Sequence, residues 1–414
     1  MRWFTLILLF FAALISHADV QVIGFAAEPL MKEFGLNSSQ WGIVGSSFFI
    51  VFIFTSFIGA TWSDRLGAKK MIFIVLAGVS LLQLGSFAII SFSMLILYRV
   101  LLGAIEGPFS PSSMSYISKI FPAELRGIAI SVFFAGAAIG GIISAPILVS
   151  LIERAGWQWT LVLLGLASLV VLIGWAFVDR SKSKHNVEVV SAKKLKWADI
   201  APVLRNPACF LTLALSSATY WLVIWLAIWA PVYLTKVMKL QPMKMAYALA
   251  GTGIAALVIL FLISTISDRI FKKNQSYRKS RVLVAGISTI IGGLSFALIP
   301  FLGNSIVMVF VALCVAKGTS YLNISIGVQV MIKLMPERAG LMAGIYSLGN
   351  NITQLVAPVI IGILVQAGGK NLMLGFNYSI YLIGGLFLLT SILFLIFVKP
   401  DKVVETTVPE TLTS

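Results

Sequence analysis

Long apolar stretches alternate with short polar segments along almost the whole chain. Crossing the hydrocarbon core of a bilayer takes about 20 apolar residues, and twelve stretches reach roughly that length. The pattern therefore predicts an all-α, polytopic membrane protein with twelve transmembrane helices. The predicted spans are 4–30, 39–62, 71–91, 94–118, 127–151, 157–178, 208–234, 245–266, 282–301, 305–332, 340–366 and 375–398.

The most polar internal segment divides these spans into six and six. Residues 179–206 are rich in Lys and Arg and follow the sixth span. We expect 1–178 to form an N-terminal six-helix bundle, 179–206 a cytoplasmic central loop, 207–398 a C-terminal six-helix bundle and 399–414 a cytoplasmic tail.

The first span also imitates a signal peptide. Arg2 precedes an apolar run to Ile15, and Ser16-His17-Ala18 resembles a small-x-small cleavage site. Cleavage there would leave only an orphan half-span before Leu30 and would spoil the six-plus-six division. We therefore interpret 4–30 as the first helix.

Composition agrees with a membrane protein. The chain is 59% hydrophobic and only 11% charged, whereas soluble domains carry roughly 25% charged residues. Its net charge of +16 does not indicate nucleic-acid binding, because the basic residues lie in short loops rather than on one face. Cys209 and Cys314 both lie in apolar stretches, so no disulfide framework is expected.

The basic residues also predict the topology. Lys and Arg concentrate in alternate loops and ends, which the positive-inside rule assigns to the cytoplasm. Both termini are therefore expected to be cytoplasmic. The loops on the opposite side carry only Lys32, Arg154, Lys236, Lys239, Lys244 and Lys370.

An internal repeat relates the two halves. Residues 60–66 read ATWSDRL and residues 264–270 read STISDRI, each after the second span of its half. Two further matches keep the same order, a Pro-Glu-Arg region after the fourth span and an Ala-Pro pair in the fifth. Parallel repeats of this kind are a known transporter architecture, with the substrate site at the midplane between the halves.

The loop after the second span carries a resemblance to a known family. It reads Ala60-Thr61-Trp62-Ser63-Asp64-Arg65-Leu66-Gly67-Ala68-Lys69-Lys70. It resembles the signature G-x-x-x-D-R-x-G-x-[KR]-[KR] of the major facilitator superfamily, with Ala60 where glycine is usual. The resemblance covers essentially the whole chain and implies two pseudo-symmetric six-helix halves. The alternative for this segment is an ordinary solvated loop. We predict a cytoplasmic gate formed by Asp64, Arg65, Gly67, Asp268 and Arg269.

A motif in the fourth span resembles one family within this superfamily. It reads Tyr98-Arg99-Val100-Leu101-Leu102-Gly103-Ala104-Ile105-Glu106-Gly107-Pro108-Phe109-Ser110-Pro111-Ser112. This resembles R-x-x-x-G-x-x-E-[AG]-P-x-x-P of the anion:cation symporter family, which includes bacterial sugar-acid/proton symporters and the sialin group. That family usually carries an Asp-Arg pair in its first helix. Here Asp19 matches the Asp, and Val20 stands in place of the Arg.

Two carboxyls lie near mid-depth of their spans. A charge at a helix centre costs at least roughly 2.5 kcal/mol, so an ionisable residue there is a functional candidate by default. We interpret Asp19 and Glu106 as proton-coupling groups, loaded on one side of the membrane and released on the other. The alternative is a polar clamp between helices.

Two cations also lie within spans. Arg99 is two helical turns before Glu106 on the same face, so it is either a counter-ion to Glu106 or an anchor for an anionic substrate. Lys317 has no acidic neighbour in its own span, and an isolated buried cation needs an anionic partner. We expect Lys317 to take over the anchoring role that is missing at Val20, with a structural ion pair as the alternative.

Several polar side chains at similar depth are candidates for the remaining substrate contacts. Packing is the alternative for each of the aromatic members, and one of the paired asparagines is expected to be structural. The candidates are His17, Tyr220, Trp221, Tyr321, Asn323, Asn350 and Asn351.

These observations predict a monomeric, proton-coupled symporter that takes up a small organic anion across the cytoplasmic membrane. No enzyme signature is visible, and two His residues do not supply a usual metal site, so no metal or other cofactor is expected. The proton gradient is the expected driving force, with sodium as the alternative. The rival functions are a proton-coupled exporter of drugs or metabolites and a non-transporting membrane sensor.

Overall fold

The computed structural model describes residues 2–178, 206–303 and 305–398. Within these ranges the protein is helical and contains no strand. Most of the predicted central loop and all of the predicted 399–414 tail lie outside the described residues.

The described part of the N-terminal half contains eight α-helices, and two predicted spans, 4–30 and 94–118, are each divided between two of them. The helices are α1 (Arg2–Phe25), α2 (Ala27–Glu33), α3 (Ser38–Leu66), α4 (Ala68–Leu84), α5 (Phe92–Glu106), α6 (Phe109–Ile120), α7 (Ala123–Ala155) and α8 (Trp157–Ala176).

The C-terminal half begins with a helix that the sequence predicted as regular, but which contains two π-helical segments. These are η2 (Trp225–Trp229) and η3 (Tyr233–Val237); a third π-helical turn, η4 (Arg278–Val282), follows α12. The α-helices are α10 (Pro207–Ile224), α11 (Ala230–Val232), α12 (Pro242–Asn274), α13 (Leu283–Ala297), α14 (Ile306–Ser320), α15 (Leu322–Leu334), α16 (Ala339–Ala367) and α17 (Leu372–Phe397).

Eleven helical stretches in the described ranges are long and apolar enough to cross a membrane. The remaining predicted crossing is α4, whose 17 residues measure about 26 Å at 1.5 Å per residue. It packs against α8 in the same bundle. With α4 included, the described part contains the twelve predicted crossings, and the chain is a multi-pass membrane protein.

Two pairs of helices make the most extensive contacts between the halves, and α1 also contacts η2. α3 packs against α16, and α7 packs against α12. The repeat equates α3 with α12 and α7 with α16, so each pair joins the second crossing of one half to the fifth crossing of the other. Such reciprocal packing is what an approximate twofold axis between parallel repeats produces.

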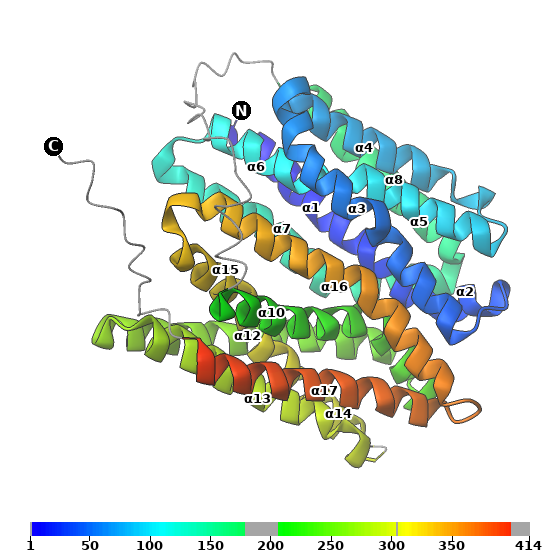
Figure 1. The fold of residues 1–414 in the computed structure, drawn as a ribbon. Helices are drawn as coiled ribbons and strands as arrows, with labels where there is room; N and C mark the ends of the chain where they lie inside the picture. Colours follow the sequence, from blue (N-terminus) through cyan, green and yellow to red (C-terminus); the bar gives the residue numbers. More distant parts are fainter. Residues whose placement is uncertain (1, 179–205, 304, 399–414) are drawn as a thin grey trace.

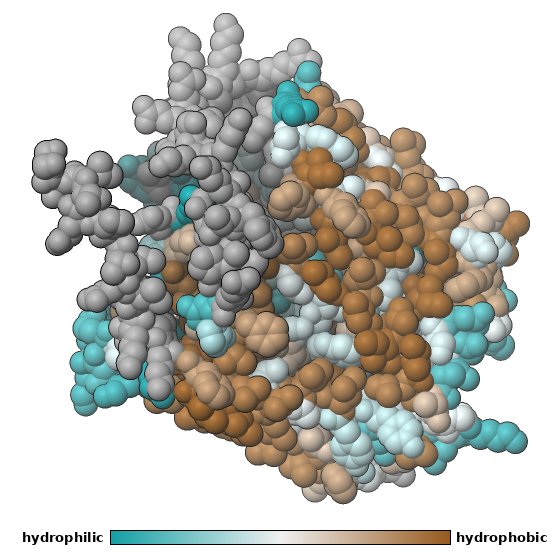
Figure 2. Space-filling view, in the orientation of Figure 1, coloured by the Kyte–Doolittle hydropathy of each residue, from teal (hydrophilic) through white to brown (hydrophobic). Residues whose placement is uncertain are grey.

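The outer surface is strongly apolar. Figure 2 shows a broad expanse of hydrophobic side chains between more polar ends. Large apolar groups such as Phe57 and Phe177 are 78% and 76% exposed, which would be unfavourable in water but suits contact with lipid.

The contacts between the halves are concentrated at one side of the molecule. Figure 1 shows the start of α1 and the end of α17 together on one side, here called the proximal side. On the opposite, distal side, Lys236 forms an ion pair with Glu28 and the Ser38 N–H donates to Gln366 Oε1 at 3.1 Å. A cavity of about 550 Å³ lies beside this closure, lined by both halves.

Candidate functional site

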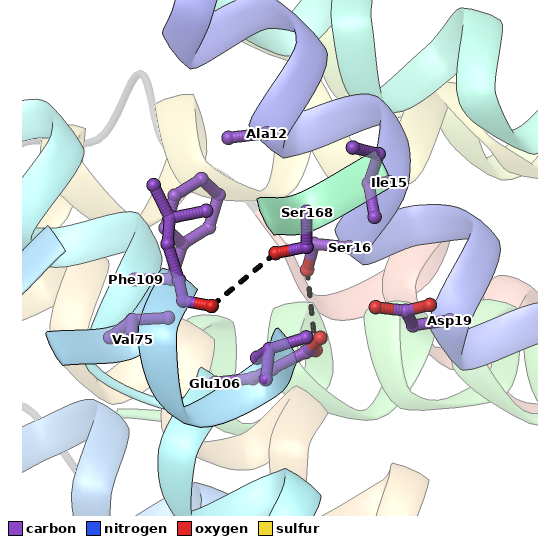
Figure 3. A pocket seen from close by; sticks show the side chains of 10 residues that line it. Ala12, Ile15, Ser16, Asp19, Val75, Glu106, Phe109 and Ser168 are labelled. Atoms are coloured by element: carbon purple, nitrogen blue, oxygen red, sulfur yellow. Dashed lines mark hydrogen bonds between the residues drawn. The ribbon is translucent and has the colours of Figure 1, made fainter. Parts of the chain in front are cut away.

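Asp19 and Glu106 meet inside the N-terminal half. Asp19 lies on α1 and Glu106 ends α5, and the two side chains are 1% and 4% exposed. Ser16 Oγ donates to Glu106 Oε2 at 3.2 Å. Figure 3 shows Ser16, Asp19 and Glu106 turned toward one small cavity.

A helix break places Glu106 there. The predicted fourth span is divided at Gly107-Pro108 into α5 and α6, because proline interrupts the backbone hydrogen bonding of a helix. Gly107 also lets α3 come close, since a Cβ at this position would lie 2.1 Å from Thr55 Oγ1. The carboxyl of Glu106 therefore ends a helix against α1 instead of continuing into the next turn.

The cavity beside these carboxyls is small and polar at one wall. It lies among α1, α4, the α5–α6 break and α8, and its volume is about 10 Å³. Ser168 of α8 contributes a hydroxyl that donates to the Leu76 carbonyl oxygen at 3.4 Å. Asp19 interacts directly with Gln83 of α4 and with Glu106, although within the described ranges neither Asp19 oxygen nor Glu106 Oε1 accepts a well-oriented hydrogen bond.

Arg99 lies in the same half, two turns before Glu106. It is 1% exposed, and its guanidinium carbon is 4.8 Å from the centroid of the Phe48 ring. It interacts electrostatically with Asp19 and Glu106, but it forms no ion pair within 4.0 Å in the part of the chain described. The structure thus places Arg99 near Asp19 and Glu106, against Phe48 of α3.

Lys317 lies on α14, in the other half. Its Nζ is 5.6 Å from the centroid of the Tyr321 ring, and no carboxylate pairs with it in the described ranges. A Cβ at Gly253 of α12 would lie 3.7 Å from that Nζ and 2.8 Å from Ile142 of α7. Lys317 therefore lies beside the α7–α12 junction between the halves.

His17 and Gln21 approach the same junction from α1. A Cβ at Gly141 of α7 would lie 3.1 Å from Gln21 Nε2 and 3.9 Å from His17 Cδ2. His17 is exposed although it lies deep among protein atoms. His17 therefore faces an accessible space beside α7, the helix that packs against α12 of the other half.

Tyr220 and Tyr321 have the same character. Both side chains are partly exposed, lie deep in the protein and interact with each other. No hydrogen bond of either hydroxyl to another described residue is present. With Lys317 and His17 they form a group that we call the interhalf cluster: His17, Gln21, Tyr220, Lys317 and Tyr321.

Other predicted substrate contacts lie in an internal network of the C-terminal half. Asn323 Nδ2 donates to Thr219 Oγ1 at 3.0 Å and to Thr289 Oγ1 at 2.8 Å. Ser216 donates to Asn350 Oδ1, and Tyr346 donates to the Asn323 carbonyl, each at 2.7 Å.

The last two predicted contacts lie elsewhere in the C-terminal half. Asn351 accepts from Gln354 at 3.1 Å, and the partly buried Trp221 packs against the apolar core.

The predicted gate residues lie at the proximal ends of α3 and α12. Gly67 joins α3 to α4 with φ +88°, a conformation that favours glycine, and Arg65 is exposed; the side chain of Asp64 lies outside the described part of the structure. Asp268 forms a 2.7 Å ion pair with Arg281 of η4, beside the exposed Arg269.

Sequence reasoning did not find several residues of these sites. Ser16 and Ser168 line the small cavity, Gln21 joins the interhalf cluster, and Arg281 pairs with Asp268. For Ser16 a signal existed, since it is three residues before Asp19 and therefore on the same helical face. For Ser168 none existed, because its position depends on how α8 packs against α4.

Twelve crossings in two repeated halves, with charged groups buried inside, define a membrane transporter rather than an enzyme. A sequence model of the Major Facilitator Superfamily matches residues 9–347, and the chain belongs to this superfamily.

Similar proteins include sugar-acid transporters. The chain is 24% identical to the hexuronate transporter of Bacillus subtilis, over 95% of this chain and 94% of that one. It is 23% identical to the D-galactonate transporter of Escherichia coli, over 93% and 94%. Among solved structures, a bacterial homologue of the human lysosomal transporter Spinster superposes with a TM-score of 0.80 at 18% identity, covering 95% of this chain and 96% of the other.

Proposed function

We propose that this protein is a proton-coupled symporter that takes up a small organic anion, such as a sugar acid or another carboxylate, by alternating access. Full-length relatives bear the names of hexuronate and D-galactonate transporters, which supports an anionic substrate. The concentration of Lys and Arg in alternate loops supports cytoplasmic termini in a bacterial inner membrane.

One observation carries the proposal. Carboxyls and a lysine lie in opposite halves: Asp19 and Glu106, with Arg99 nearby, in the N-terminal half, and a partly buried Lys317 without a carboxylate partner in the described part of the C-terminal half. Two carboxylates outweigh the single charge of Arg99, and Lys317 has no carboxylate beside it in the described ranges. Because net charge held away from water is costly, each site favours a partner from outside the protein. A proton neutralises a carboxyl, and an organic anion neutralises the lysine.

The arrangement supports a simple division of labour. Lys317 attracts the carboxylate of the substrate, while the tyrosine hydroxyls and the amide of Gln21 offer hydrogen bonds to its other polar groups. Protonation of the carboxyl pair removes charge from the interior of the N-terminal half. With both ligands bound, the two halves carry less unpaired charge and rock past each other at lower cost.

Transport by purified protein in liposomes tests this proposal. A proton gradient with the acidic side outside the liposomes should drive uphill accumulation of a hexuronate or aldonate by the wild-type protein. Glu106→Gln keeps the shape of the side chain but removes a proton site, so it should lose accumulation and retain substrate exchange. Proton-driven accumulation by Glu106→Gln at the wild-type level would refute the coupling role, and proton-driven efflux alone would favour an exporter.

A further inference from the structure

We infer that Lys317 holds the substrate carboxylate among apolar neighbours, and that these neighbours select an aromatic monocarboxylate with no hydroxyl group on the carbon next to its carboxyl over a sugar acid. The inference deepens the proposed function and rests on it, because it names the class of anion that the same site prefers. Lys317 and its neighbours are here called the lysine subsite: Ile142, Gly253, Cys314, Lys317 and Tyr321.

The neighbours of the Lys317 ammonium are aromatic, aliphatic or weakly polar. Its Nζ lies 5.6 Å from the centroid of the Tyr321 ring. A Cβ added at Gly253 would lie 3.7 Å from Nζ and 2.8 Å from Ile142 Cγ1, so the backbone of α12 and an aliphatic side chain of α7 lie beside the ammonium. Cys314, one turn earlier on α14, contributes a thiol, which is a weak hydrogen-bonding group. In the described ranges no hydroxyl, amide or carboxylate is hydrogen-bonded to Nζ.

A sugar acid fits these surroundings poorly. In an aldonate the carbon next to the carboxyl carries a hydroxyl group, which enters the subsite together with the carboxylate. Beside Lys317 this hydroxyl would lose its water and meet a ring, an aliphatic side chain and a glycine backbone. A polar group that is buried without a hydrogen bond is unfavourable, so the lysine subsite disfavours a hydroxyl at this carbon.

Other polar side chains are engaged elsewhere or lie on another side of α7. Asn323 and Asn350 are 1% and 3% exposed and are hydrogen-bonded within the C-terminal half. Gln21 lies beside Gly141, which directly precedes Ile142 on α7, and successive residues of a helix face about 100° apart. Gln21 is therefore placed to bind a polar group at the far end of the substrate rather than a hydroxyl next to the carboxylate.

The charge of the site favours a single carboxylate. Lys317 has no carboxylate partner in the described ranges. The other cation within a span, Arg99, is 1% exposed and interacts with Asp19 and Glu106, so its charge is directed into the N-terminal half. A second carboxylate on the substrate would lose hydration without gaining a positive partner, and the site therefore favours a monoanion.

Two tyrosines favour an aromatic body. Tyr220 and Tyr321 are partly exposed and interact with each other. With the carboxylate on Lys317, a ring attached to that carboxylate lies beside Tyr321. Ring pairs gain stability from offset or edge-to-face contact beyond the area that they bury, so an aromatic acid should bind more tightly than an aliphatic acid of similar size.

Two ligands that differ by one hydroxyl test the inference on the wild-type protein. Phenylacetate and mandelate have the same ring and the same charge, but mandelate carries a hydroxyl on the carbon next to its carboxyl. Calorimetry with the purified full chain, without a proton gradient, should give a Kd for mandelate about ten- to hundredfold above that for phenylacetate, since an apolar site rejects an added hydroxyl by about this factor. The Kd for gluconate should also be at least tenfold above that for phenylacetate. A difference of less than tenfold for either ligand, or no binding of phenylacetate, would overturn the inference.

Ile142 provides a matched pair of variants. Ile142→Val and Ile142→Thr have side chains of the same shape, but only threonine brings a hydroxyl to the lysine subsite. Ile142→Thr should lower the ratio of the mandelate Kd to the phenylacetate Kd at least threefold relative to Ile142→Val, because the ligand hydroxyl gains a hydrogen-bond partner. Equal ratios in the two folded variants would overturn the assigned subsite.

Tyr321→Leu tests the aromatic preference. It should raise the Kd of phenylacetate about three- to tenfold and that of cyclohexylacetate, which has no aromatic ring, by less. The control is Tyr378→Leu on α17, a residue that is 41% exposed and lies outside the interhalf cluster; it should change neither Kd. Equal effects of Tyr321→Leu on the two ligands would overturn the aromatic preference.

Proton-driven uptake into liposomes separates this inference from the proposed function. Accumulation of gluconate without a preference for phenylacetate would refute the inference alone. Tight binding of phenylacetate without proton-driven accumulation of any of these acids would refute the proposed function and leave the preference in place.

Discussion

Gly24 determines how closely α1 approaches the C-terminal half on the distal side. A Cβ at Gly24 would lie 1.9 Å from the carbonyl oxygen of Ala227 in η2, whereas a carbon and a carbonyl oxygen in contact are about 3.3 Å apart. The obstructing atom belongs to the backbone of a buried segment and cannot rotate away. Gly24→Ala therefore requires α1 and η2 to separate by roughly 1 Å or more.

The cost of this separation falls on one conformation. Overpacking a close contact typically costs about 1–3 kcal/mol, and the contact exists only while the halves are closed on the distal side. A difference of this size changes a two-state equilibrium about 5- to 150-fold. Gly24→Ala should therefore shift the population toward a state that is open on the distal side and should slow turnover.

Cysteine labelling measures the shift. Thr235 lines the distal cavity beside the closure, so a Thr235→Cys protein lacking the native Cys209 and Cys314 should react faster with an impermeant maleimide when Gly24→Ala is added. Gly344→Ala is the control, because a Cβ there meets nothing within 4 Å. Wild-type labelling and turnover in a folded Gly24→Ala protein would refute the reasoning.

Three further substitutions test other parts of the structure. Lys317→Ala should raise the Kd of an anionic substrate about ten- to hundredfold, since a hydrogen bond to a charged group is worth roughly 1.5–3 kcal/mol. Lys317→Arg should raise the Kd less. An unchanged Kd of Lys317→Ala, measured by calorimetry, would show that the lysine is structural. Asp268→Asn breaks the 2.7 Å pair with Arg281 and should slow turnover more than it weakens binding, and a tenfold affinity change at constant turnover would contradict this. Tyr346→Phe removes a buried hydroxyl with two hydrogen-bond partners and should lower the free energy of unfolding by about 1–3 kcal/mol; an unchanged Tm would contradict that expectation.

The helical crossings were predictable because they depend on local chain properties. A run of apolar residues has to be about 20 residues long to cross the hydrocarbon, and that length is visible in a single sequence. The fold itself was predicted from the repeated Asp-Arg loops, and the superfamily match confirms it. The break at Gly107-Pro108 could also have been read from its residues.

The rotation of each helix about its own axis was harder to predict from the sequence. Asp19 and Glu106 were both expected near mid-depth, but the sequence does not specify that they face one small cavity within the N-terminal half. The same limit applies to Arg99, which rests against Phe48. These orientations depend on packing against residues that are distant in the chain. A single sequence does not show which residues make those contacts.

The π-helical segments could not be predicted from the sequence, for a related reason. Trp225–Trp229 and Tyr233–Val237 look like ordinary apolar helix in the sequence, yet both are π-helical. Their aromatic rings pack closely with Phe296 and Phe376. Each widened turn adds a residue per turn and re-aims the rings that follow it, so this local geometry follows from tertiary packing.

The two faces of α1 have a consequence for how this protein can change its cargo. Residues 17 and 21 border the interhalf cluster, while residues 12, 15, 16 and 19 border the carboxyl cavity. If the proposed function holds, substitutions on the first face should alter which anion is recognised and leave proton coupling unchanged. On that proposal, a library confined to positions 17, 21, 220 and 321 should change the substrate specificity while uphill accumulation is retained.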